Sequence, residues 1–206
     1  MKKTHFICII AFCVLPFYAK GQSSVGVKAD INLSNMWITK STNIKTNMKA
    51  GGSAGFFYKY KWREFRAVQA DMFFRYRTSE VINQVTGETA DYSYFGIEIP
   101  VYSLLQAEID NRIFYVGLGP FASVGLYSRS HSNDRSINLY QKDPTYNKTP
   151  IHRWNFGAAF IIGYELKCRL QFNFNYQLGF RNMSGDVFEN VDMISQAVCL
   201  GAGYRF

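Results

Sequence analysis

Two histidines, with the serines and aspartates around them, are the residues whose chemistry could support catalysis. His131 and His152 both fall in residues 128–153, the longest segment without regular alternation of apolar and polar residues. Enzymes that transfer acyl groups use serine and histidine with a partner that holds the imidazole. A lipid deacylase would place a His-x-Ser motif on a strand face, whereas His131 is followed directly by Ser132 in a predicted loop. We therefore expect no catalytic residue and interpret these side chains as polar loop residues.

A metal centre or a cofactor site is not expected either. His131 and His152 have no partner at the short spacing that zinc ligands adopt. The carboxylates do not follow the pattern of a calcium-binding loop. The residue types that usually hold a cofactor are therefore present only as isolated side chains.

Nine charged residues share one face of segments in which apolar and polar residues alternate, and they form the candidate site. Isolated charges are costly to bury, so we expect these residues to pair into a network. The network either makes a rigid, plugged interior or lines a gated path for ions. We favour the plugged interior, because a barrel of eight strands leaves little room. The nine residues are Lys28, Asp30, Lys59, Asp71, Arg75, Glu98, Glu165, Arg181 and Arg205.

Strands with a period of two must position these charges. The clearest segment is 170–181, where Leu, Phe and Tyr occupy every second position and Gln, Asn, Gly and Arg occupy the others. Successive side chains of a strand point to opposite faces, so this segment has one apolar and one polar face. A polar face rich in amides and glycine suits a narrow interior better than bulk water. Blocks of about ten such residues are typical of membrane-spanning strands.

The same alternation predicts eight strands joined by connections of alternating length. Short connections are expected at 61–64, 106–111 and 166–168, and long ones at 34–49, 78–91, 128–153 and 182–191. This predicts an all-β fold, an eight-stranded antiparallel up-and-down transmembrane β-barrel, which closes because an open sheet edge cannot be satisfied in hydrocarbon. The predicted strands are 25–33, 51–62, 65–77, 94–105, 112–127, 154–166, 170–181 and 192–206.

The first 21 residues have the pattern of a Sec signal peptide. Lys2 and Lys3 precede an apolar run over residues 6–17, and Ala19-Lys20-Gly21 is a small-x-small cleavage site. The run is too short to span a bilayer as a helix. We therefore expect residues 22–206 to form one barrel domain after export.

Charge and composition agree with this interpretation. Charged residues make up 18% of the chain, below the roughly 25% of soluble proteins, and aromatic residues make up 17%. Three of the positive charges in the net charge of +8 belong to the predicted signal peptide, which leaves about +5 spread along the rest. Nucleic-acid binding requires basic residues clustered in a stripe, so we expect no nucleic-acid partner.

The two cysteines after the signal peptide, Cys168 and Cys199, should remain free thiols. Export would permit a disulfide. The predicted strands, however, place the two residues on opposite faces and out of register, where they cannot be bridged.

Four motifs in order give the chain a resemblance to a known family. They are GVKADINLSN at 26–35, YFGIEIPV at 94–101, YVGLGP at 115–120 and LGAGYRF at 200–206. The set resembles the PorT-like outer-membrane β-barrel proteins of Bacteroidetes, whose architecture is that of the small OmpA/OmpX-type barrels; Phe95-Gly96 departs from the leucine more common there. The resemblance implies a multi-pass protein of the bacterial outer membrane. It implies little about activity, and we do not transfer the namesake's role in protein secretion.

The last strand ends in an apolar face with Tyr204 and the terminal Phe206. Barrels of this type resemble one another here because the barrel-assembly machinery reads this strand. We interpret Tyr204 and Phe206 as an assembly signal, which makes that machinery a partner during biogenesis.

The predicted outer loops differ in charge. The first and third carry an excess of lysine and arginine, and the second and fourth carry an excess of aspartate and glutamate. Basic loops near the outer leaflet could contact the phosphates of lipopolysaccharide, which with outer-membrane lipid is the expected partner. Solvated loops with no ligand are the simpler interpretation.

The leading hypothesis is a non-enzymatic outer-membrane barrel with an envelope-structural, adhesive or ligand-contact role carried by its surface loops. The alternatives are a lipid A-modifying enzyme that uses His131 or His152, a narrow channel, and an accessory component of a secretion machinery.

Overall fold

The computed structural model describes residues 23–39, 44–84, 87, 89–132, 135–141, 151–184 and 192–206. The predicted signal peptide, residues 1–21, lies outside the described residues. No helix in the described part of the chain is long and apolar enough to cross a membrane.

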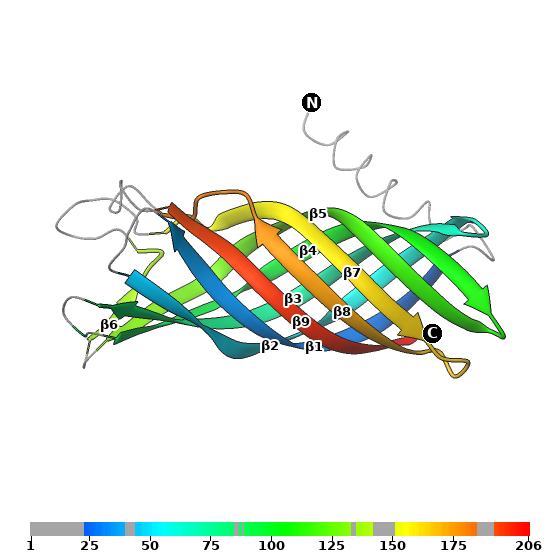
Figure 1. The fold of residues 1–206 in the computed structure, drawn as a ribbon, viewed down its shortest axis with the longest axis horizontal. Helices are drawn as coiled ribbons and strands as arrows, with labels where there is room; N and C mark the ends of the chain where they lie inside the picture. The colour runs from blue at the N-terminus through cyan, green and yellow to red at the C-terminus, as the bar shows by residue number, and fades with distance from the viewer. Residues whose placement is uncertain are drawn as a thin grey trace, which may run out of the picture.

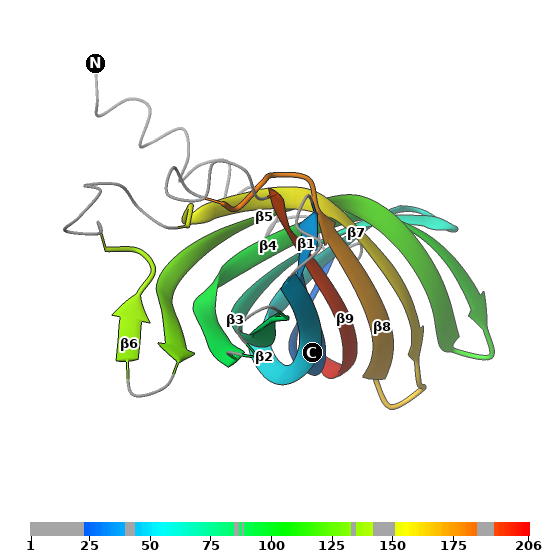
Figure 2. The same ribbon diagram turned by 60° about the vertical axis from the view of Figure 1, so that its left-hand side comes forward.

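Eight antiparallel strands close into one barrel (Figure 1). Each strand pairs with the next along the chain; β5 pairs with β7, and β1 pairs with β9 to complete the ring. One additional strand, β6, is not part of the ring. It pairs only with the outer part of β5 and appears as a short arm beside it (Figure 2). The predicted fold is therefore confirmed. The strands are β1 Ser23–Thr39, β2 Ile44–Arg63, β3 Arg66–Asn83, β4 Thr89–Ile109, β5 Arg112–Ser132, β6 Arg135–Asn138, β7 Trp154–Glu165, β8 Leu170–Gly179 and β9 Asp192–Arg205.

One end of the barrel, the short-turn end, holds the tight turns. The two-residue turn Asp110-Asn111 joins β4 to β5 with φ of 52° and 60°, the type I′ conformation that matches the twist of paired strands. The described chain also begins and ends here, at Ser23 and Phe206 (Figure 1). Short turns at one end and longer connections at the other are typical of bacterial membrane barrels.

The strands at the other end, the loop end, are longer than predicted. The described parts of the segments expected as loops at 34–49 and 78–91 are largely strand, residues 128–132 and 135–138 of the expected loop 128–153 are strand, and the expected strand 170–181 instead ends earlier. The apolar signal on the outer face stops where lipid gives way to water, but the ladder of backbone hydrogen bonds continues, so alternation marked only part of each strand. The corrected ends are Thr39, Ile44, Asn83, Thr89, Ser132 and Gly179.

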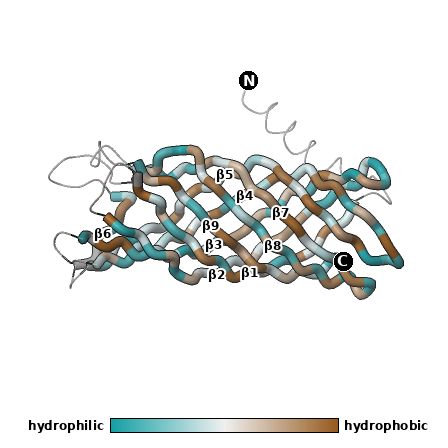
Figure 3. The backbone as a smooth tube through the Cα atoms, in the orientation of Figure 1, coloured by the Kyte–Doolittle hydropathy of each residue, from teal (hydrophilic) through white to brown (hydrophobic). Residues whose placement is uncertain are grey.

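The outer face of the barrel is a continuous apolar belt. Along each strand, exposed apolar residues alternate with buried residues. Figure 3 shows how hydrophobic and hydrophilic residues vary along the strands. Aromatic side chains such as Trp62 and Phe65 near the short turns, and Trp154 and Phe180 near the loop end, mark both rims of the belt. Such girdles sit at the two membrane–water interfaces.

The interior is not uniformly polar. A buried apolar cluster fills the side formed by β3, β4, β5 and β7; its members are Ala67, Tyr102, Leu104, Tyr115, Phe121, Ala159 and Ile161. Tyr115 lies across Gly163 of β7, where a Cβ atom would overlap the phenol ring. The interior glycines therefore make room for large side chains rather than for water.

Replacing Gly163 with alanine tests this packing. The added methyl group meets the Tyr115 ring, so we expect the free energy of unfolding to fall by about 1–3 kcal/mol. Gly52→Ala is the matched control, because the nearest atom to a Cβ there is the Asp30 carbonyl oxygen at 3.6 Å. Urea unfolding of both variants in the same lipid vesicles gives the comparison; equal values would contradict the packing described.

Candidate functional site

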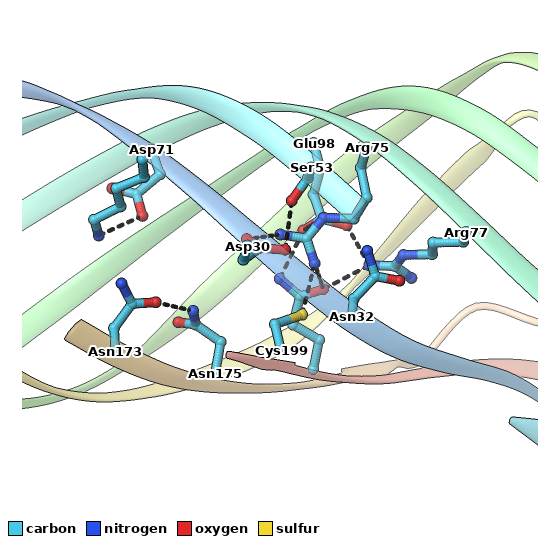
Figure 4. Close-up of polar contacts among 12 residues, drawn as sticks. Asp30, Asn32, Ser53, Asp71, Arg75, Arg77, Glu98, Asn173, Asn175 and Cys199 are labelled. Atoms are coloured by element: carbon cyan, nitrogen blue, oxygen red, sulfur yellow. Dashed lines mark hydrogen bonds and ion pairs between the residues drawn. The ribbon is translucent and has the colours of Figure 1, made fainter. Parts of the chain in front are cut away.

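The predicted charged face forms a network at the centre of the barrel interior (Figure 4). Asp30 of β1, Arg75 of β3 and Glu98 of β4 each occupy an inward position of the alternation and are almost fully buried. Strands β3 and β4 are neighbours in the ring, whereas the contact of Arg75 with Asp30 links β3 to β1, which is not its neighbour. The network therefore braces strands that share no backbone hydrogen bonds as well as neighbouring ones.

Arg75 is the centre of the network. Its Nη2 lies 3.3 Å from Asp30 Oδ2, and its Nε lies 3.4 Å from Glu98 Oε1. Its Nη1 donates to Cys199 Sγ of β9 at 2.9 Å and to Gln177 Oε1 of β8 at 3.4 Å. The guanidinium also lies 5.0 Å from the centre of the Phe73 ring. One side chain thus links five strands of the ring.

Arg77 forms the second layer, towards the loop end. Its Nη2 donates to Glu98 Oε2 at 2.5 Å and to Gln177 Oε1 at 2.6 Å, and its Nη1 donates to Ser195 Oγ at 2.8 Å. Gln177 Nε2 donates in turn to Glu98 Oε1 at 2.6 Å. Two carboxylates, Asp30 and Glu98, therefore balance two guanidinium groups, the condition under which burying charge is tolerable.

Two smaller groups continue the network towards the short-turn end. Lys28 Nζ lies 3.1 Å from Asp71 Oδ2, and Gln69 Nε2 donates to Asp71 Oδ1 at 2.8 Å. On the opposite wall, Asn175 Nδ2 donates to Asn173 Oδ1 at 2.6 Å (Figure 4). Both groups are compact polar pairs rather than open coordination sites.

At the short-turn end itself, Glu165 accepts hydrogen bonds from two residues. Arg205 Nε and Nη2 both lie 2.6 Å from Glu165 Oε1, and Gln171 Nε2 donates to Oε2 at 2.8 Å. Lys59 is buried nearby, 5.2 Å from the centre of the Tyr115 ring. Eight of the nine predicted charges thus point into the interior.

Arg181 is the exception, and its predicted inward position is wrong. Strand β8 ends at Gly179, and the Phe180 amide closes the ladder by donating to the Phe156 carbonyl. Arg181 lies beyond that point, half-buried, and no described contact joins it to the network. The alternation of apolar and polar residues continues to Arg181, two residues beyond Gly179, the last paired position of β8.

Several network residues were not singled out from the sequence. Arg77 falls on the inward face by alternation but was not among the nine candidates, and Gln177 and Cys199 share that face. Ser53 donates to Asp30 Oδ1 at 2.5 Å. It stands in Gly51-Gly52-Ser53-Ala54-Gly55, the spacing of a nucleophile elbow, but it lies within β2 rather than at a strand–helix turn. Position on the inward face was the signal available for all of them.

An apolar cap closes the interior above Arg77. Tyr92 and Tyr94 of β4 pack against Met36 of β1 and against residues from the loop end; the cap consists of Met36, Tyr92, Tyr94, Tyr140, Ile151 and Met183. Between the cap and Arg77 the remaining cavity is about 20 Å³, room for about one water molecule. This cavity is too small to form an aqueous path past the network by itself.

The histidines lie apart from this network. His131 is exposed on β5, where it stands opposite Asp91 of β4, so its predicted place in a loop is wrong. His152 is half-buried next to the cap, and its backbone amide donates to the Met183 carbonyl. Among the described residues, no group of three or more His, Cys, Asp or Glu side chains could hold a metal ion.

The remaining predicted features lie on the outside of the barrel or at its turns. Cys168 is exposed in the β7–β8 turn while Cys199 is buried in the interior, and both are free, as predicted. The rings of Tyr204 and Phe206 face outward with their centres 5.9 Å apart. Their role as an assembly signal stays a prediction.

The oppositely charged segments predicted as loops pair with each other on the strand extensions. Lys49 of β2 lies 3.3 Å from Glu80 of β3 and 2.6 Å from Asp91 of β4. Hydrogen bonds from Asn47 and Lys49 hold the pKa of the Glu80 carboxyl below its ordinary 4.5, and the hydrogen bond to Asp91 raises the pKa of Lys49. Lys49 thus compensates part of the negative charge of Glu80 and Asp91.

Replacing Glu98 with glutamine tests the network. Two buried guanidinium groups would lose the carboxylate they share, so we expect a loss of about 3–5 kcal/mol of stability. Glu108→Gln is the control, because Glu108 is exposed and pairs with Lys61 at 3.4 Å, which is worth no more than about 1 kcal/mol. Denaturant unfolding in lipid vesicles measures both; similar losses would show that the network is not what holds the interior.

The pKa of Glu80 can be followed by carbon NMR of its carboxyl group. The folded state favours the carboxylate, so its stabilising contribution is present above about pH 4.5 and is lost as pH falls through the lowered pKa. Asn47→Ala and Lys49→Met should each move the pKa back towards 4.5. An unchanged titration in both variants would rule out these hydrogen bonds, while Lys167→Met at the far end serves as the control.

Several solved structures of bacterial proteins are similar to this chain. The fold is similar to Ail, the attachment invasion locus protein of Yersinia pestis (13% identity, 90% of this chain and 99% of that chain, TM-score 0.45). It is also similar to Neisserial surface protein A (12% identity, 89% of this chain and 99% of that chain, TM-score 0.47). A third similar structure is OprG of Pseudomonas aeruginosa (11% identity, 90% of this chain and 96% of that chain, TM-score 0.41). None of the curated proteins matches the sequence. The family model described as outer membrane protein beta-barrel domain matches residues 18–185, and the chain therefore belongs to this family of bacterial outer-membrane proteins.

Proposed function

We propose that this protein is a non-conducting, non-enzymatic barrel whose envelope-structural, adhesive or ligand-contact role is carried by the surface outside the membrane. The observation behind the proposal is the length of β4 and β5, each of 21 residues. At about 3.3 Å per residue and a tilt of about 45°, such strands rise about 50 Å along the barrel axis, whereas the apolar band is about 25 Å tall. A substantial part of each strand therefore stands in water.

The part outside the membrane is a wall on one side of the barrel only. Strands β7 and β8 have 12 and 10 residues and end near the rim, while β2 to β5 continue past it (Figure 1). We call this the outer wall, residues 44–50, 77–83, 89–94, 127–132 and 135–138. A wall held by backbone hydrogen bonds is ordered before any ligand arrives, which lowers the entropic cost of binding.

The outward face of the wall is polar across four strands. Asn47, Glu80, Asp91 and His131 stand opposite one another in one row, and the backbone pairing continues from His131 to Ser136 of β6. The exposed cations Lys45 and Arg129 flank this row, and Arg129 also lies 5.2 Å from the centre of the Tyr127 ring. Arginine held in this way suits charge-assisted hydrogen bonds to phosphate, so lipopolysaccharide is the partner we propose.

The resemblance motifs support a finer placement among PorT-like proteins of Bacteroidetes. Two of them contain network acceptors, Asp30 in GVKADINLSN and Glu98 in YFGIEIPV. A barrel that needs a carboxylate at these two inward positions has a physical reason to keep these motifs. This supports the placement and carries no statement about secretion.

Reconstitution tests the proposal. In planar bilayers the refolded chain should give no conductance steps, because the network and the apolar cap fill the interior. Vesicles containing lipopolysaccharide should bind the refolded chain. The double variant Lys45→Glu/Arg129→Glu should bind these vesicles several-fold more weakly, and Lys167→Glu at the other end of the barrel is the control.

Each alternative has its own outcome. Conductance steps would make the protein a channel. Equal binding by wild type and the double variant would remove the contact role of the wall. A change in lipid A mass that disappears in His131→Ala/His152→Ala would make it an enzyme, and recovery of secretion components in pull-downs from the native envelope would make it their accessory.

A further inference from the structure

A second feature lies at the short-turn end of the barrel. In bacterial membrane barrels this end faces the periplasm, so its opening is the periplasmic mouth. A cavity of about 100 Å³ opens there between β1, β2, β4, β5 and β9. We call it the mouth pocket; the polar side chains used below are Ser24, Lys59, Lys61, Gln106 and Arg205. It shares no residue with the outer wall, so it stands independently of the function proposed above.

Lys59 is the feature of the pocket that needs a partner. It is 5% exposed, and its ammonium group lies over the Tyr115 ring at 5.2 Å from the centre. Among the described residues it takes part in no hydrogen bond and no ion pair. Because Lys59 Nζ is not one of the fully buried, unpaired polar atoms, its ammonium group reaches solvent in the pocket, and the Tyr115 ring face replaces only part of its hydration.

The nearby carboxylates are already in use. Glu165 attracts Lys59 electrostatically, but its two oxygens accept from Arg205 and Gln171. Lys61 pairs with the exposed Glu108. Arg205, Lys28 and Lys61 all repel the Lys59 ammonium. The pocket therefore holds a positive charge that no described side chain neutralises.

Gln106 adds a second polar group without a partner. It is 4% exposed, and its Oε1 is buried without a hydrogen-bond partner. Its backbone amide donates to the Phe65 carbonyl at 3.0 Å, so the side chain is held at the pocket. A side-chain amide offers both donors and an acceptor, which matches a singly protonated phosphate.

We propose that the mouth pocket binds a phosphate group, either free phosphate from the periplasm or the phosphate of a phospholipid head group from the inner leaflet. The pocket has the volume of about three water molecules, enough for one tetrahedral oxyanion. Donors converge on it from separate strands: Ser24 of β1, Lys59 of β2 and Arg205 of β9. Lysine and arginine in such an arrangement bind phosphate through charge-assisted hydrogen bonds.

The test uses the chain refolded in maltoside micelles, which contain no phosphate, at low ionic strength. Inorganic phosphate is titrated by calorimetry against wild type, Lys59→Gln and the control Lys167→Gln, whose lysine lies in a turn at the same end. Wild type and control should bind alike, and Lys59→Gln should bind at least tenfold more weakly. Heat-dependent gel mobility confirms that each variant is folded.

A second arm separates the two sources of phosphate. Native mass spectrometry measures which lipid stays bound to the protein. It compares protein transferred out of phosphatidylglycerol with protein transferred out of an uncharged glycolipid. Retention of phosphatidylglycerol by wild type but not by Lys59→Gln assigns the site to a lipid head group, and binding of inorganic phosphate alone assigns it to a free ion.

Two outcomes would overturn the proposal: no binding of phosphate or phosphatidylglycerol by wild type, or equal binding by Lys59→Gln. If Lys59→Gln fails to fold, the wild-type chain decides the matter. Phosphate should then slow acetylation of Lys59 several-fold and leave Lys167 unaffected, and equal rates at Lys59 with and without phosphate would reject the site.

Discussion

Every backbone N–H and C=O group that enters hydrocarbon must find its partner within the protein, and the rest of this structure depends on that constraint. Pairing between β1 and β9 meets it by leaving no edge in the ring. Closure then divides the side chains into two sets. The outward set faces lipid and must be apolar, while the inward set has only to fill a narrow space without leaving a charge alone.

The inward set solves this problem differently along the barrel axis. At the centre, where water has little access, Asp30 and Glu98 balance Arg75 and Arg77, and Gln177, Cys199 and Ser195 accept further hydrogen bonds from the two guanidinium groups. These contacts join β3 to β8 and β9, strands that share no ladder. The network thus fixes strands across the interior in the same way that backbone bonds fix neighbours around it.

The sequence predicted the features that contact with lipid requires, which are the strands and their two faces. It did not predict the features that depend on packing in the interior. Alternation located eight strands and the inward face of eight charges, because an apolar residue at every second position is a strict requirement. It gave no sign that Phe121 and Ile161 form an apolar cluster with Tyr102 and Tyr115 in the interior. It also ended strands where lipid ends, so the outer wall was taken for loops, and it extended β8 to include Arg181. Pairings such as that of Arg75 with Cys199 depend on register across the ring, which a single sequence does not encode locally.

Uncompensated chemistry is therefore found where the barrel meets water. The centre is neutral and sealed, so it offers a ligand neither space nor charge. A charge at the periplasmic mouth is less costly because the pocket admits solvent, and Lys59 remains there without an acceptor while Lys28, one layer deeper, is paired with Asp71. The same reasoning applies at the loop end, where Lys49 can be shared between two carboxylates because all three groups are hydrated. Function in a barrel of this width is thus expected at its two ends, and the interior serves to hold those ends in place.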